Sequence, residues 1–162
     1  MQVAPPPRSP SQVLWLLNRH LYKSTQPEKY ATLFLGIYDG HNRHLVYSNA
    51  GHLPPLIFSQ DGSVRHLDIG GTVVGLFDNV KYEESTVRLS PDDIFVAFSD
   101  GITEPENEFG EFGEQRLIET IATHRNLPLQ RIADQVIAAV QDWIGSSEQP
   151  DDITIVLARA RS

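Results

Sequence analysis

Three aspartates stand next to apolar, strand-like segments of the sequence. Asp100 follows the run 94–98, and Asp151-Asp152 precedes the run 153–158. Carboxylates held at strand ends are the oxygen ligands that hard cations such as Mg²⁺ and Mn²⁺ prefer. The same residue types also form ordinary turns, because Asp and Gly suit turn conformations. The spacing alone therefore leaves two interpretations open, a metal site or two structural turns.

The segments that would position these aspartates are mostly short strands separated by turn residues. Short β-rich or apolar runs bounded by turn residues predict strands over 32–38, 44–49, 54–59, 63–67, 82–89, 94–98 and 153–158. Helical spacing predicts a helix from Ser9-Pro10 to about 22–25, and further helices over 114–124 and 128–144. Strands grouped between helices predict an α+β fold in which antiparallel sheets pack face to face, with helices outside.

The composition narrows the class of protein. The 162 residues, 40% of them hydrophobic, suffice for one domain with a core. A net charge of −8 argues against nucleic acid and anionic membranes as partners. The absence of cysteine excludes disulfides and fits a cytoplasmic location. No apolar run approaches the ~20 residues of a membrane span, and the proline-rich lead-in over 1–8 has no signal-peptide core.

A set of motifs resembles the SpoIIE/RsbU branch of the PPM (PP2C-like) serine/threonine phosphatases. The matches cover about residues 9–159, and in order they are Ser9–Asn18, Ala31–Phe34, Asn49–Pro55, Gly75-Leu76, Ser99–Glu104, Phe112-Gly113 and Asp151–Thr154. The resemblance implies a PP2C-like β-sandwich with α-β-β-α layers. It also implies two divalent ions, Mn²⁺ or Mg²⁺, that activate a water for attack on a phosphoserine or phosphothreonine.

The resemblance also assigns roles to individual residues. By motif, Asp100 and Asp151 would bind one ion directly, and no side chain is assigned as catalytic. Gly101 and Asp152 would support the metal-binding turns. His52 could act as a general acid near a phosphoryl group. The favoured alternative is that Asn49–His52 is a tight loop in which Asn49 and His52 bond to the backbone.

The Asp-Gly-His sequence at Asp39–His41 resembles the metal motif of eukaryotic PP2C enzymes. The residues that follow it are Asn42-Arg43-His44 instead of the glycines of that motif. Asp-Gly between two strand-like runs is also a strong hairpin signal. We therefore expect a hairpin turn at Asp39-Gly40 in preference to a metal ligand.

The family pattern includes an N-terminal third whose aspartates supply the remaining metal contacts, and nothing before Ser9 matches it. We therefore expect residues 9–162 to form the C-terminal part of the phosphatase domain, incomplete at its N-terminus and weak or inactive alone. The rival function is a non-catalytic interaction or dimerisation module, which exposed strand edges would favour. The implied partners are a phosphorylated STAS-type anti-sigma-factor antagonist as substrate and a sensor or receiver domain in the full-length protein.

Overall fold

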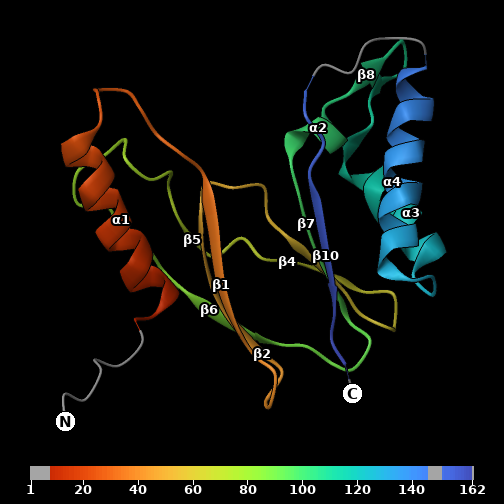
Figure 1. Cartoon of the computed structure of the whole chain (residues 1–162), viewed down its shortest axis with the longest axis horizontal. Helices are drawn as coiled ribbons and strands as arrows, with labels where there is room; N and C mark the ends of the chain where they lie inside the picture. The colour runs from red at the N-terminus through yellow and green to blue at the C-terminus, as the bar shows by residue number, and fades with distance from the viewer. Residues whose placement is uncertain (1–7, 146–150, 162) are drawn as a thin grey trace. The chain divides into compact units, whose positions relative to one another are not determined.

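The computed structural model describes residues 8–145 and 151–161 (Figure 1). Most of the expected proline-rich lead-in lies outside the described residues, and Arg8 is exposed. The chain divides into two compact units. Unit 1 comprises Met1–Pro54 and Leu67–Leu89, and unit 2 comprises Pro55–His66 and Ser90–Ser162.

Unit 1 is one helix on a four-stranded sheet. The helix is α1 (Pro10–Ser24), and the strands are β1 (Leu33–Asp39), β2 (His44–Ala50), β5 (Gly70–Gly71) and β6 (Ser85–Arg88). Strand β2 pairs antiparallel with β1 and β6 and parallel with β5. The sheet is therefore antiparallel except for the two-residue strand β5, which makes it mixed.

The sequence of α1 explains where the helix begins and which face it buries. Pro10 occupies its first turn, and the Ser9 backbone N–H donates to Gln12 Oε1 at 3.1 Å. Leu14 is fully buried and packs with Ala50, Val74 and Tyr82 in the core of unit 1. The apolar face of α1 thus covers β1 and β2.

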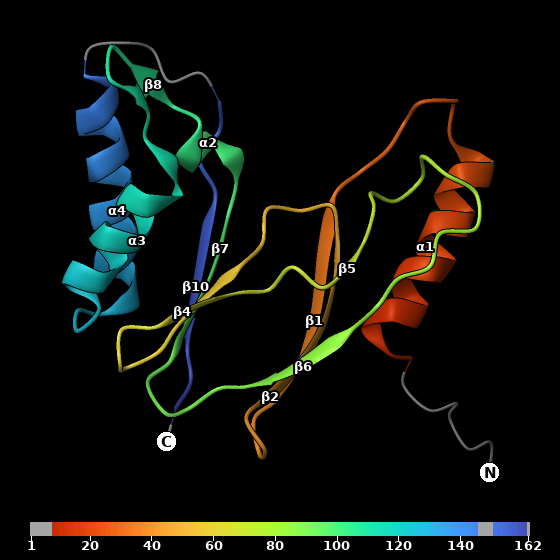
Figure 2. The ribbon, with the colours of Figure 1, turned by 180° about the vertical axis from the view of Figure 1, so that it is seen from behind.

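Unit 2 is a second sheet covered by a pair of helices. The sheet has the order β10-β7-β3-β4, formed by β3 (Leu56–Phe58), β4 (Val64–His66), β7 (Ile94–Phe98) and β10 (Ile155–Arg159). The remaining elements are α2 (Asp100–Thr103), the hairpin of β8 (Glu106–Asn107) and β9 (Gly110–Glu111), α3 (Gly113–His124) and α4 (Leu129–Ile144). Seen from behind in Figure 2, β7 and β10 run side by side, with α3 and α4 together on one side of them.

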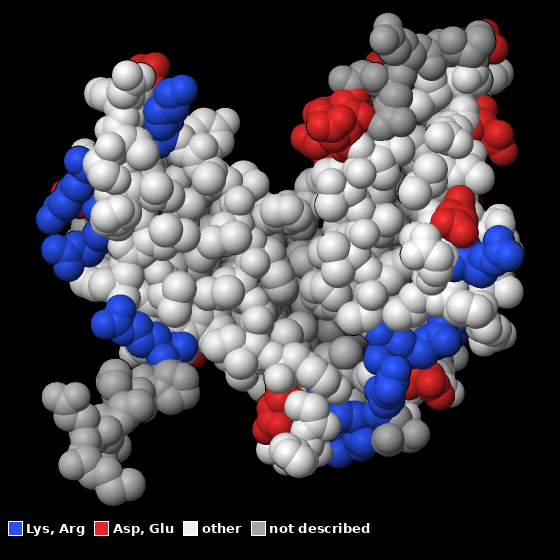
Figure 3. All heavy atoms as spheres, in the orientation of Figure 1, with Lys and Arg blue, Asp and Glu red and all other residues white. Residues whose placement is uncertain are grey.

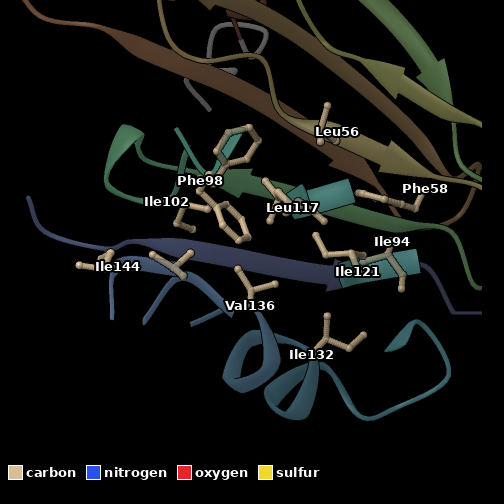
Figure 4. Packing of buried hydrophobic residues seen from close by; sticks show 13 residues of the cluster. Leu56, Phe58, Ile94, Phe98, Ile102, Leu117, Ile121, Ile132, Val136 and Ile144 are labelled. Atoms are coloured by element: carbon tan, nitrogen blue, oxygen red, sulfur yellow. The ribbon is translucent and has the colours of Figure 1, made fainter. Parts of the chain in front are cut away.

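The core of unit 2 lies between its sheet and its helices. Alternate residues of β7 are buried, and they meet the buried stripes of α3 and α4 (Figure 4). Ile132, Val136 and Val140 of α4 follow the three-to-four spacing of a helix with one buried face. This packing fixes β7, the strand whose end carries Asp100.

Most of the predicted elements are present with small shifts of their ends, and 94–98 matches β7 without any shift. The predicted strand over 82–89 is shorter, because only Ser85–Arg88 pairs with β2. Strands β5, β8 and β9 and helix α2 were not predicted, because these glycine-rich or polar segments have no apolar pattern of their own. Among the described residues, no helix is both long and apolar enough to cross a membrane.

Candidate functional site

The sequence predicts Asp100 in a turn at the end of a buried strand, and the structure corrects this local conformation. Strand β7 ends at Phe98, and Ser99 is the extended residue that precedes α2. Asp100 is the first residue of α2, and its carbonyl accepts the Glu104 N–H at 2.8 Å. The Asp100 side chain therefore leaves the strand end on a helical turn, and the residue is exposed.

The antiparallel pairing of β7 with β10 brings the second acidic motif to the same end of the sheet. Phe98 pairs with Ile155, so the chain that enters β10 lies beside the chain that leaves β7. The Ser99 N–H donates to the Thr154 carbonyl at 3.0 Å. The turn that carries Asp100 is thus bonded to the segment that follows Asp151 and Asp152.

Gly101 permits a close backbone contact between the two acidic turns. It is buried, and a Cβ at this position would lie 2.2 Å from the Asp152 carbonyl oxygen. Any other residue would push the turns apart, because packed interiors leave no room for such an overlap. The requirement for glycine here concerns space, since Gly101 is not among the residues with positive φ.

Ser99 is a positioning residue that the sequence analysis missed. Its hydroxyl donates to the Asp152 carbonyl at 3.1 Å and accepts the Thr154 N–H at 3.0 Å. It therefore joins the two turns through a side chain as well as through its backbone. The available signal was a small hydroxyl residue directly before Asp-Gly at a strand end, a position where Ser commonly bonds to nearby backbone.

The carboxylates differ in how the structure engages them. The Asp152 N–H donates to Asp151 Oδ1 at 2.7 Å, which orients the Asp151 carboxylate. Asp152 contributes its carbonyl to the contacts with Ser99 and Gly101. Within the described residues, no hydrogen bond engages the carboxylate of Asp100. Asp100 and Asp151 are both exposed and can therefore reach a ligand from solvent.

The arrangement fits part of a divalent metal site. The two acidic turns are joined by a backbone contact that only glycine allows. Their carboxylates could supply hard oxygen ligands there. Mg²⁺ is commonly held by one or two protein carboxylates and keeps several waters. Among the described residues, however, no group of three or more His, Cys, Asp or Glu could hold a metal ion. A metal centre at these turns would therefore need ligands beyond the side chains that the structure describes here.

The predicted residues Asn49 and His52 belong to unit 1, whereas the aspartates belong to unit 2. Asn49 is buried, and its amide donates to the carbonyls of His52 at 3.0 Å and Leu67 at 3.2 Å. The His52 N–H donates to Asn49 Oδ1 at 2.8 Å. His52 Nδ1 lies 2.7 Å from the Leu53 carbonyl. Both side chains thus bond to backbone within a tight loop, as the favoured alternative describes.

Asp39 lies in the β1–β2 hairpin, also in unit 1. Its carboxylate accepts the His41 N–H at 2.9 Å and the Asn42 side-chain amide at 2.8 Å. The His41 hydrogen bond, followed by that of Asn42, holds the pKa of Asp39 below its usual value. The predicted hairpin turn is therefore present, and the turn itself uses both carboxylate oxygens.

The fold is that of a PP2C-like domain. The chain belongs to the family described as Stage II sporulation protein E (SpoIIE), which matches residues 3–161. This match confirms the resemblance drawn from the motifs.

Two relatives illustrate the similarity in sequence. Protein IcfG of Synechocystis sp. is 34% identical over 130 residues, which cover 78% of this chain and 20% of that protein. The phosphoserine phosphatase RsbU of Bacillus subtilis is 29% identical over 156 residues, which cover 94% of this chain and 45% of RsbU. The chain therefore spans less than half the length of these two relatives.

Solved structures confirm the α+β, PP2C-like fold. The SiaA-PP2C domain of Pseudomonas aeruginosa superposes with a TM-score of 0.81 at 22% identity, covering 94% of this chain and 61% of that one. The phosphatase domain of SpoIIE from Bacillus subtilis, from a Mn-presoaked crystal, gives a TM-score of 0.67 at 24% identity. That match covers 93% of this chain and 65% of the other.

Proposed function

We propose that this chain is the part of a metal-dependent protein serine/threonine phosphatase that carries Asp100 and Asp151 as ligands of a Mn²⁺ or Mg²⁺ ion. The observation that carries the proposal is the joining of the two acidic turns at one end of β7 and β10. Family membership supports the reaction class. When bound, the ion would lower the pKa of a coordinated water and offset charge on the phosphoryl oxygens.

The residues of this chain contribute placement to that reaction. Asp100 and Asp151 present carboxylates from neighbouring segments, and the Asp152 N–H orients Asp151. Ser99 bonds to the Asp152 carbonyl, and Gly101 leaves the space in which that carbonyl lies. Preorganised ligands bind an ion without first having to order a loop, so this support raises the affinity for the metal.

A metal titration tests the proposed ligands. We expect Mn²⁺ binding, measured by isothermal titration calorimetry, to be lost in Asp100→Asn and Asp151→Asn, because each change removes a charged ligand at nearly constant size. Asp142→Asn is the matched control, since Asp142 is an exposed carboxylate on α4. Equal Mn²⁺ affinity of Asp100→Asn and Asp142→Asn would disprove the assignment.

We further propose that the chain alone turns over phosphate monoesters weakly or not at all. In-line displacement at a two-metal site needs ligands for both ions, and the described residues contain no group of three or more side chains that could hold even one. Hydrolysis of para-nitrophenyl phosphate with Mn²⁺ measures this directly. Robust turnover that Asp100→Asn abolishes would contradict the weak-activity proposal and still support the metal ligands.

The proposed substrate is a phosphorylated STAS-type regulatory protein, and the proposed intramolecular partner is a sensor or receiver domain. The support is the relative RsbU, which is a phosphoserine phosphatase and is longer than this chain. Dephosphorylation of a serine-phosphorylated STAS protein by the full-length protein, followed by phosphate-affinity electrophoresis, tests the substrate class. Unchanged phosphorylation alongside hydrolysis of para-nitrophenyl phosphate would exclude it.

A non-catalytic dimerisation role has one specific observation in its favour. Strand β1 lies at the edge of its sheet, with Ile37 48% and Tyr38 45% exposed. Edge strands with apolar side chains are prone to pair with another chain. Ile37→Lys should therefore reduce self-association in sedimentation-velocity experiments, whereas Ile69→Lys, at an exposed residue outside the named strands, should not. A monomer at all concentrations would exclude this role.

A further inference from the structure

A polar hollow lies in unit 2, away from the acidic turns. Its volume is about 480 Å³, and its lining residues are Gln60, Asp92, Arg125, Asn126 and Arg159. Arg159 ends β10 and pairs with Ile94, the first residue of β7. The acidic turns adjoin the other end of the same strand pair, so the hollow and the candidate metal ligands occupy opposite ends of β7 and β10.

Two arginines of the hollow are held by backbone carbonyls. Arg159 Nη2 donates to the carbonyls of Arg125 at 2.6 Å and Leu127 at 3.0 Å. Arg125 Nη1 donates to the Ser59 carbonyl. A guanidinium has five N–H donors in a fixed fork, so donors remain on both side chains. Carbonyls orient these groups without neutralising their charge.

Neither of the two arginines forms an ion pair within the described part of the chain. Within the described residues, the salt bridges join Arg65 to Asp93 and His66 to Glu114, and neither involves Arg125 or Arg159. Both arginines are half-buried. A partly buried cation without an ionic partner attracts an anion more strongly than an exposed one, because lower solvent exposure weakens dielectric screening.

Hydrogen bonds join the chain segments around the hollow. The Asp92 N–H donates to the Ala160 carbonyl at 2.8 Å, and Gln60 Nε2 donates to the Pro91 carbonyl at 3.0 Å. Asp92 is the one carboxylate among the lining residues, and it lies 3.3 Å from Gln60 Nε2. The lining thus carries two positive charges and one negative charge on a preformed frame.

The charges of unit 2 are also separated along its length. In Figure 3, acidic side chains lie at the upper end of unit 2, where Figure 1 shows α2, and basic side chains gather lower down with fewer acidic ones among them. The separation places an electropositive region in a chain whose overall charge is −8. An anion would therefore be drawn to the lower end of unit 2 and repelled from the upper end.

We propose that this hollow binds the phosphoryl group of a small molecule. Arginine forks match the oxygen geometry of a phosphate and form charge-assisted hydrogen bonds with it. The volume falls within the range of small-molecule sites, so it accommodates inorganic phosphate or a small phosphate monoester. The site is independent of the proposed phosphatase reaction, because it uses none of the acidic turns.

Nuclear magnetic resonance titration tests this site on the whole chain. Inorganic phosphate and glycerol 3-phosphate are added at constant ionic strength, with glycerol and chloride as controls, and a chelator removes divalent metal. We expect saturable shifts of the Gln60 and Asn126 backbone amides. Shifts with both probes, or with either alone, support the site and identify free phosphate or the monoester as its ligand. No saturation at tens of millimolar of either probe would overturn the proposal.

Two arginine variants distinguish a specific site from general electrostatic attraction. Arg159→Gln should weaken phosphate binding by about tenfold or more, because charge-assisted hydrogen bonds are lost. Arg131→Gln removes the same charge from an exposed position on α4 outside the hollow, and should change affinity by less than about twofold. Equal weakening by both variants would overturn the proposal.

Asp92→Asn should change the phosphate affinity in the opposite direction, and this test leaves both arginines in place. Removing the negative charge should strengthen phosphate binding by about fivefold. Asp92 has φ of 66°, a conformation that asparagine also tolerates, so this variant should fold even where Arg159→Gln does not. Weaker or unchanged binding in Asp92→Asn would contradict the proposed electrostatics.

Discussion

Replacing Gly101 by alanine tests how the two acidic turns are held together. The new Cβ would lie 2.2 Å from the Asp152 carbonyl oxygen, and contacts below 3.0 Å do not persist. The turns must therefore separate by roughly 0.8 Å, and overpacking of this kind costs about 1–3 kcal/mol. We expect the free energy of unfolding to fall by that amount. Mn²⁺ affinity should fall as well, because the separation moves Asp100 relative to Asp151.

Urea denaturation and Mn²⁺ calorimetry of the same preparations measure both effects. Gly40→Ala is the matched control, since the nearest atom to a Cβ there is Tyr38 Cε1 at 4.0 Å and its φ is also not positive. Both substitutions reduce the entropy of the unfolded chain, which by itself stabilises by about 0.4–1 kcal/mol. A Gly101→Ala protein as stable as Gly40→Ala, with wild-type Mn²⁺ affinity, would refute the reasoning.

Three further changes probe other contacts. Ser99→Ala removes a donor to the Asp152 carbonyl and an acceptor of the Thr154 N–H, and should cost about 1 kcal/mol in urea denaturation; an unchanged midpoint would contradict this. Asn18→Ala leaves the Gly75 N–H and the Phe77 carbonyl without their amide partner at a fully buried position. We therefore expect the free energy of unfolding to fall by about 2–4 kcal/mol. A fall below about 0.5 kcal/mol would be inconsistent with this reasoning. Burial raises the pKa of Tyr82 from 10.0 to about 12. Its unfolded form therefore ionises first, and stability should decline as pH rises between these values. Tyr82→Phe should flatten that decline in alkaline denaturation curves, and an equally steep decline would exclude Tyr82 as its source.

The sequence predicted the long elements because each has its own periodicity. The buried faces of α1 and α4 repeat at helical spacing, and β7 is a continuous apolar run. Strand β5 has no such signal, since it consists of Gly70 and Gly71 and pairs with β2 through long-range packing. A Cβ at Gly70 would lie 1.8 Å from the Asn49 carbonyl oxygen. Glycine is therefore required here by a neighbour that is distant in the sequence, and the local pattern does not reveal it.

The pairing at the candidate site could be predicted only in part. The residue types of Asp100 and Asp151 identified both acidic turns, and the family pattern linked them. The conformation of Asp100 was missed because α2 spans four residues and has no amphipathic repeat. The role of Ser99 was missed because its partners, Asp152 and Thr154, lie more than fifty residues away in the chain.

The contrast between Asp39 and Asp100 shows what distinguishes two similar Asp-Gly sequences. The Asp39 carboxylate is engaged by the hairpin that contains it, through His41 and Asn42, and these bonds lower its pKa. The Asp100 carboxylate is engaged by no hydrogen bond within the described residues, and the residue is exposed. A carboxylate whose own turn already satisfies its oxygens must give up those bonds to take a metal ion. Asp100 loses no such bond on binding, and the two turns are held close by the Ser99 hydroxyl and by the backbone contact at Gly101 instead of by the Asp100 carboxylate. The difference therefore lies in the hydrogen bonds around each carboxylate, which the local Asp-Gly pattern does not encode.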